Sequence, residues 1–96
     1  MYLTDFAMES KIEIIQINIS GEDKPGMTSS LTDILARYDA FILDIGQANI
    51  HQSLTLGILF MTTSDKSGAI LKELLFKASE LGVMIRFTPI TEEHYQ

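Results

Sequence analysis

The sequence predicts an α+β fold in which four antiparallel strands form one sheet and two helices cover one of its faces. Three observations support this prediction. Stretches rich in β-branched and aliphatic residues occur beside two stretches whose apolar residues recur at helical spacing. Their order along the chain is strand, helix, strand, strand, helix, strand. Because crossover connections are right-handed, this order places both helices on one face of a ferredoxin-like βαββαβ sandwich.

The first strand is predicted over residues 11–20. Its isoleucines divide between two faces, Ile15, Ile17 and Ile19 on one and Ile12 and Ile14 on the other. Apolar residues on both faces are typical of a central strand, or of a sheet face that a partner covers. Residues 21–26 then form a loop, in which Pro25 presets φ and Gly26 lacks a Cβ, so that the backbone turns sharply into a helix.

The first helix is predicted over residues 27–38. Its apolar stripe consists of Met27, Leu31, Ile34, Leu35 and Tyr38. Asp33 and Arg37 stand four residues apart on the polar side, a spacing at which we expect an ion pair. The hydroxyl residues 28–30 are predicted to cap the start of this helix, with contact to a ligand as the alternative.

Residues 40–51 and 54–62 are predicted to form an antiparallel hairpin, because only a short turn at residues 51–53 joins them. In the first of these strands, an expected edge strand, Phe41, Leu43 and Ile45 alternate with Ile42, Asp44 and Gly46. In the second, Leu54, Leu56, Ile58 and Phe60 share one face. Gly46 and Gly57 are expected to lie roughly opposite each other, where they allow a close approach or a β-bulge.

Residues 64–67 are predicted to be a polar loop and residues 68–81 the second helix. The apolar residues of this helix are Ile70, Leu71, Leu74, Leu75, Ala78 and Leu81. Gly82 suits the left-handed position that follows a helix. The last strand is predicted over residues 83–90, where Pro89 ends it or confines it to a sheet edge. Ile, Leu and Met residues then lie on the helix-free face, which predicts that this face or an edge strand meets another subunit or domain.

Composition limits the classes of function. With 96 residues, 46% of them hydrophobic, the chain suits one domain, preceded by a tail at residues 1–10 and followed by the start of a linker at residues 92–96. There is no cysteine, and thirteen acidic against seven scattered basic residues argue against nucleic-acid binding. No apolar run approaches the ~20 residues of a membrane helix. We therefore predict a cytoplasmic protein without membrane contact.

Motifs that carry catalysis are absent from the sequence. His51 and His94 lie far apart, without a metal-ligand partner at helical or hairpin spacing. The segment Ser64-Asp65-Lys66-Ser67 lacks the Asp-x-Asp-x-Thr arrangement of aspartyl phosphatases, and no phosphate-binding GxxxxGK[ST] loop occurs. The strands also lack the stacking aromatics of RNA-binding domains that share this element order. We predict a domain with no catalytic residue, metal or cofactor of its own.

The loop Asp23-Lys24-Pro25-Gly26-Met27, between a strand and a helix, resembles the signature of the ACT domain family of amino-acid-sensing regulatory domains. Three blocks extend the resemblance to the amino-terminal ACT domains of bacterial phosphoserine phosphatases. They are Asn18 to Thr28, Ile42 to Gln47, and Leu74 to Val83. The resemblance implies an ACT domain over residues 11–91. It also implies that a catalytic domain of the haloacid-dehalogenase type, which uses Mg²⁺ to hydrolyse phosphoserine, follows in the parent protein.

The resemblance further implies a homodimer that binds a small amino acid, serine above all, between its subunits and beside this loop. Backbone N–H groups near Gly26 and Met27, next to Pro25, are expected to hold the ligand carboxylate. Asp23 and Asp44 are candidate acceptors for its ammonium group, and Gln47 a further amide contact. The alternatives are that Asp23 caps the turn and that Asp44 is simply solvated.

One position departs from the pattern of serine-sensing ACT domains. Where those domains offer an Asn at the start of the second strand, this chain has Phe41. A domain that only dimerises its enzyme is therefore a second hypothesis. A stand-alone regulator, similar to the ACT-domain repressors of glycine cleavage, is a third.

Overall fold

The computed structural model describes residues 11–90. Strand β1 (Ile12–Glu22), helix α2 (Met27–Arg37), strands β2 (Phe41–Ile50) and β3 (Ser53–Thr63), helix α3 (Ser64–Leu81) and strand β4 (Met84–Ile90) follow one another along the chain. This order confirms the predicted βαββαβ fold. The tail predicted at residues 1–10 and the linker predicted at residues 92–96 lie outside the described residues.

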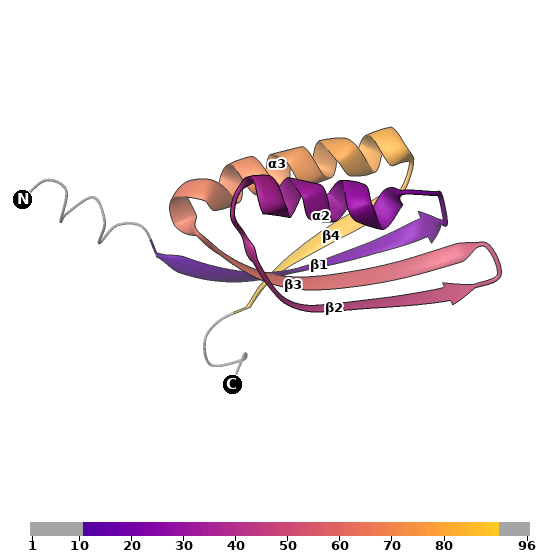
Figure 1. The fold of residues 1–96 in the computed structure, drawn as a ribbon, viewed down its shortest axis with the longest axis horizontal. Coiled ribbons are helices and arrows are strands. Elements are labelled where there is room, and N and C mark those ends of the chain that lie inside the picture. Colours follow the sequence, from indigo (N-terminus) through magenta and orange to yellow (C-terminus); the bar gives the residue numbers. More distant parts are fainter. Residues whose placement is uncertain (1–10, 91–96) are drawn as a thin grey trace, which may run out of the picture.

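The four strands form one antiparallel sheet in the order β2-β3-β1-β4. Figure 1 shows two layers, with both helices on the same face of the sheet. As predicted, β1 is a central strand, β2 is an edge strand, and Pro89 lies in the other edge strand, β4. A proline is tolerated there because an edge strand leaves half of its N–H groups without a ladder partner.

The core lies between the sheet and the helices. Its strand residues are the alternate apolar side chains that the sequence places on one face: Ile15, Ile17, Ile19, Leu54, Leu56, Ile58 and Phe60. The helices contribute Met27, Leu31, Ile34, Leu35, Ile70, Leu74 and Ala78. Burying one of the large aliphatic side chains contributes about 1.5–3 kcal/mol, so this two-layer core supplies the main stabilising term.

Helix α3 begins earlier than predicted. Ser64 to Ser67 form its first turn rather than a loop, and Asp65 lies where a negative charge favours the start of a helix. The Ser64 amide donates to the carbonyl of Lys11 at 2.7 Å, and the Lys11 amide donates to Ser64 Oγ at 3.0 Å. These long-range bonds fix the start of α3 against the start of β1. Leu75, predicted in the apolar stripe, is instead 54% exposed.

A bulge in β2 changes which face its residues occupy. The register of β2 against β3 shifts between Ile42 and Asp44, so Leu43 is the extra residue of the bulge. The bulge therefore does not lie at Gly46 or Gly57. After the bulge, Asp44 pairs with Leu59 and Ile45 with Ile58. Simple alternation put Phe41 and Ile45 on one face, and the structure contradicts this. Gly46 does lie opposite Gly57, as predicted.

Neither helix of the described chain, residues 11–90, has the length and apolarity to cross a membrane.

Candidate functional site

The loop between β1 and α2 starts the helix without a side-chain cap. Gly26 is the N-cap, with φ 76° and ψ 5°, a left-handed conformation that glycine adopts without strain. The predicted capping by residues 28–30 is therefore wrong: Ser30 Oγ donates to the Gly26 carbonyl instead. The Met27 amide donates to the Lys24 carbonyl at 3.3 Å, and the Met27 side chain is buried in the core.

The first turn of α2 leaves backbone N–H groups open. Within residues 11–90, the amides of Thr28 and Ser29 have no protein acceptor, because the first helical bond is made by Ser30. They are the donors that a carboxylate could use. The predicted donor at Met27 is already engaged in the turn.

The loop is anchored on both sides by neighbouring elements. The Lys24 ammonium donates to the Leu81 carbonyl, 2.5 Å away, and so neutralises the C-terminal end of α3. The Asp23 amide donates to the carbonyl of Gln52, in the β2–β3 turn, at 2.8 Å. At Gly21 an added Cβ would lie 2.8 Å from Val83 Cγ1, so only glycine fits there without a shift.

Four polar side chains join the loop, the start of α2 and the helix-side face of β2; we call them the polar cluster. Thr28 Oγ1 donates to Gln47 Oε1 at 3.1 Å, and Gln47 Nε2 donates to Asn49 Oδ1 at 2.9 Å. Asn49 Nδ2 then donates to Asp23 Oδ2 at 2.8 Å. These bonds run in one direction and end on the carboxylate, whose other oxygen remains able to accept.

The structure brings some of the predicted site residues together and separates others. Asp23 and Gln47 belong to the polar cluster, and Pro25 and Gly26 are exposed beside it. Asp44 does not join them: it pairs with Leu59, whose side chain lies on the helix-free face, and its Oδ1 accepts from the Ile45 amide.

Sequence reasoning missed Asn49 and gave Thr28 a capping role. The signal for Asn49 was its spacing, two residues after Gln47 in a strand, which puts both amides on one face. Together the cluster offers an anion-accepting helix start, one carboxylate and two amides, which are complementary to the charged groups of a small zwitterion. Among residues 11–90 no group of three or more His, Cys, Asp and Glu side chains lies close enough together to hold a metal ion.

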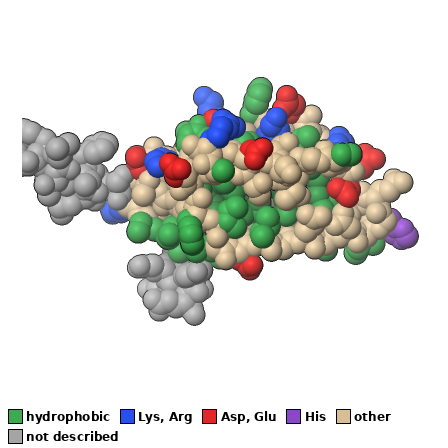
Figure 2. Space-filling view, in the orientation of Figure 1, with side chains coloured by type: hydrophobic (Ala, Val, Ile, Leu, Met, Phe, Trp, Pro, Cys, Tyr) green, Lys and Arg blue, Asp and Glu red, His purple; other side chains and the backbone are tan. Residues whose placement is uncertain are grey.

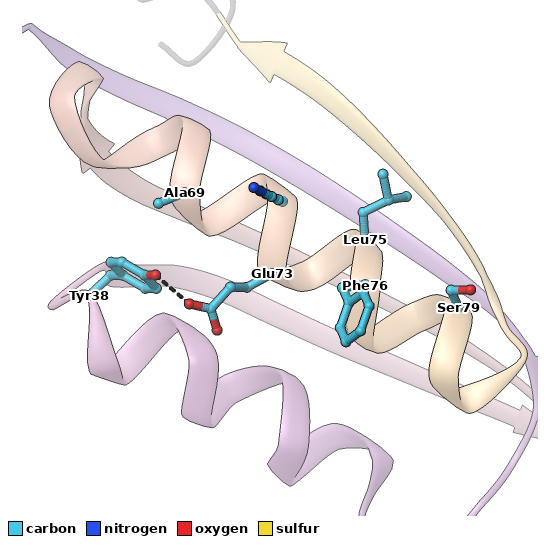
Figure 3. Close-up of a pocket in the computed structure, with 7 residues that line it drawn as sticks. Tyr38, Ala69, Glu73, Leu75, Phe76 and Ser79 are labelled. Carbon is cyan, nitrogen blue, oxygen red and sulfur yellow. Dashed lines mark hydrogen bonds between the residues drawn. The ribbon is translucent and has the colours of Figure 1, made fainter.

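A hollow lies over the helix layer, between the end of α2 and the outer side of α3 (Figure 3). Its lining is mainly apolar and consists of Tyr38, Ala69, Lys72, Glu73, Leu75, Phe76 and Ser79. Phe76 is 74% exposed. In Figure 3, Tyr38 points at Glu73, while Leu75 and Phe76 leave α3 on different sides.

The Glu73 carboxylate in this hollow accepts a hydrogen bond on each of its two oxygens. The Tyr38 hydroxyl donates to one oxygen, and Arg37 Nη2 donates to the other at 2.9 Å. Arg37 thus pairs with Glu73 of α3, and the structure contradicts the predicted pair with Asp33. The hydrogen bond from Tyr38 lowers the pKa of Glu73, and the same bond raises the pKa of Tyr38.

Comparison of the sequence with models of known protein families identifies the family of this chain. The sequence profile of the ACT domain matches residues 13–88, most of the chain. The chain belongs to the ACT domain family. This confirms the interpretation of the loop from Asp23 to Met27, and the element order agrees with the ACT fold.

Individual relatives are similar over parts of their length. Phosphoserine phosphatase SerB2 of Mycobacterium tuberculosis is 38% identical over 52 residues, which are 54% of this chain and 12% of that protein. A solved structure described as a glycine cleavage system transcriptional repressor superposes with a TM-score of 0.81 at 15% identity, over 88% of this chain and 50% of that chain. An ACT domain protein from Streptococcus pneumoniae gives a TM-score of 0.68 at 20% identity, over 80% of this chain and 89% of that chain.

The two solved structures share the fold of this ACT domain. The chain spans about an eighth of SerB2 and half of the repressor chain, so both relatives contain more than an ACT domain of this size.

Proposed function

We propose that this ACT domain is a regulatory unit that binds a small amino acid, serine or one of similar size, and that it controls a phosphoserine phosphatase. The observation that supports this is the polar cluster, which joins the signature loop to β2 beside two open backbone N–H groups. The 38% identity to SerB2 supports the choice of enzyme. Mg²⁺ belongs, in this proposal, to the catalytic domain of the parent protein.

The polar cluster offers a partner for each group of a small amino acid. The ligand carboxylate accepts from the amides of Thr28 and Ser29 at the start of α2. Its ammonium group donates to the free oxygen of Asp23. A serine hydroxyl lies within the reach of the Gln47 and Asn49 amides, which can both donate and accept.

The proposal includes a homodimer in which the site lies beside the partner. Within residues 11–90 no strand pairs with the outer edge of β2, and this strand carries Ile42 and Ile45, which are 36% and 44% exposed on the helix side. An unpaired edge strand with apolar side chains is a template for pairing with a second copy. Pairing along β2 brings that copy next to Gln47 and Asn49.

Isothermal titration calorimetry with serine, glycine and alanine tests the binding. We expect heat with serine, and about 10- to 100-fold weaker binding by the Asp23→Ala variant, because a charge-assisted hydrogen bond is lost. Asp33→Ala is the matched control: Asp33 is an exposed aspartate of α2 outside the polar cluster. Absence of heat at millimolar concentrations of all three amino acids, or equal affinity of the Asp23 and Asp33 variants, would refute amino-acid sensing.

A second candidate function is a stand-alone regulator, and the TM-score of 0.81 to the repressor structure supports it. The sequence of the full gene separates the two. A downstream segment with Asp-x-Asp-x-Thr favours the phosphatase, whereas only a second ACT domain downstream favours the regulator.

A further inference from the structure

The helix-free face of the sheet carries an apolar band near the start of β1. The strand register aligns one apolar residue from each of the four strands in a single row, and this row is Phe41, Met61, Ile14 and Ile90. Ile12 and Leu59 flank it. Ile12 is 68% and Phe41 61% exposed. Figure 2 shows hydrophobic side chains gathered on the lower surface, around the place where β1 begins.

Farther along the same face, the β2 and β4 edges differ in the size and charge of the side chains that project from them. About 13 Å from the apolar band, the row consists of Gly46, Gly57, Asn18 and Arg86, so two neighbouring positions have no side chain while the opposite edge carries a long one. The next row has Ala48 on β2 and Met84, 75% exposed, on β4. Side chains therefore project little from the face along the β2 edge, which we call low, and far along the β4 edge, which we call high.

We propose that a second copy of this chain packs face to face on this surface, about a two-fold axis that runs parallel to the strands between β1 and β3. The operation lays β2 of one copy over β4 of the other. Sheets that pack face to face lie about 10 Å apart with strand directions within about 30°, so the facing rows stay within about one strand spacing of each other.

This axis makes the face complementary to itself. Within the apolar band, Phe41 meets the partner's Ile90, and Met61 meets the partner's Ile14. In the glycine row, the partner's Arg86 enters the space above Gly46. One row on, Ala48 lies below the partner's Met84. Apolar residues thus meet apolar residues, and each low position on β2 meets a high position on β4. Every such contact occurs twice in the dimer, because the interface is isologous.

Charge supports the same orientation. Asp44 lies on β2, one row from Gly46, and the two-fold axis brings it to the partner's Arg86 as a diagonal neighbour. Within one copy the two residues are separated by three strand spacings, about 14 Å, and they make no ion pair with any residue among 11–90. The axis supplies each charge with a counter-charge that its own chain does not.

The size of the face also suits a dimer. Strands of 11 residues span about 36 Å and four strands about 19 Å, and allowance for the shorter edge strands leaves a footprint of roughly 600 Å². Side chains corrugate this footprint, so the accessible area approaches the ~800 Å² per partner of a standard interface. This contact is separate from pairing along the edge of β2, and it does not depend on amino-acid binding.

Sedimentation velocity of the full chain over a concentration series tests the contact. We expect Phe41→Asp to weaken association about a hundredfold, since it places a charge in the apolar band. Phe76→Asp, at a position of similar exposure on α3, is the control and leaves association unchanged. Gly46→Leu weakens it about tenfold. We expect the Gly46 variant to fold, because Gly46 is exposed and nothing lies within 4 Å of an added Cβ.

A mixing experiment tests the orientation. Asp44→Arg and Arg86→Asp each place like charges together and weaken self-association about tenfold. An equimolar mixture of the two variants associates as tightly as the wild type, because both contacts between unlike copies are again between opposite charges. A mixture no tighter than either variant alone overturns the proposal, as does a wild type whose association Phe41→Asp leaves unchanged. Pairing along β2 alone gives no such rescue, because Arg86 lies three strands away.

Discussion

Among the glycines of the described chain, Gly21 is the one at which an added Cβ would meet its nearest neighbour at the shortest distance, and its substitution tests how closely the signature loop is packed against the rest of the domain. An added Cβ at Gly21 would lie 2.8 Å from Val83 Cγ1, 3.1 Å from Val83 Cβ and 3.3 Å from Val83 Cα. Carbon atoms in favourable contact are about 3.5–4.0 Å apart. Because Val83 is buried, it cannot turn away into solvent. Relief therefore requires movement of the segment that joins α3 to β4.

We expect Gly21→Ala to lower the free energy of unfolding by about 1–3 kcal/mol, the usual cost of overpacking a close contact. Val83→Ala removes Cγ1, the nearest atom, and costs about 2 kcal/mol by itself. In the double variant the two losses should not add. The expected coupling is about 1 kcal/mol or more, because the alanine at position 83 leaves room for the alanine at position 21.

Urea unfolding followed by circular dichroism, at a concentration where the chain is monomeric, measures these values. Gly46→Ala is the matched control: it is also a strand glycine with φ outside the left-handed region, but nothing lies within 4 Å of its added Cβ. We expect it to change stability by no more than about 0.5 kcal/mol. If Gly21→Ala and Gly46→Ala were equally stable, or if the effects at 21 and 83 were additive, the close approach would not be the cause.

Three further substitutions test side-chain contacts that stabilise the packing of the helices and the core. Lys24→Met should cost about 1.5–3 kcal/mol in urea unfolding, because the Leu81 carbonyl loses a charged donor, whereas Lys72→Met should cost little. The pKa of Glu73 is lowered in the folded state, so its contribution to stability is present above the ordinary pKa of a glutamate and is lost as the pH falls through the folded-state value. Glu73→Gln should therefore flatten the acid side of a stability–pH profile, and an unchanged profile would contradict the Tyr38–Glu73–Arg37 arrangement. Ile58→Ala should cost about 2–5 kcal/mol in thermal or urea unfolding, because the side chain is fully buried, and a smaller loss would mean that the core collapses around the cavity.

Local periodicity accounts for the success of the sequence at the level of elements. Each strand or helix hides alternate residues, or every third and fourth residue, and this pattern is present in the chain before any long-range contact forms. For this reason the element order, the buried faces of β1 and β3, and the core residues of α2 agree with prediction. The signature loop could also be predicted from the sequence, because the turn into α2 needs a residue in the left-handed conformation, and Gly26 adopts it.

Tertiary structure decided what spacing could not. A single extra residue at Leu43 moved Asp44 to the helix-free face, away from the site predicted for it, because a one-residue shift in a strand exchanges its faces. Arg37 turned from Asp33 to Glu73, 36 residues away. Lys24, which the sequence presents as part of a loop motif, acts on the end of α3. In each case the partner comes from a distant part of the chain, where local periodicity carries no information. The family and the fold thus follow from the sequence alone. The polar cluster and the relief of the helix-free face exist only once the sheet has set its register.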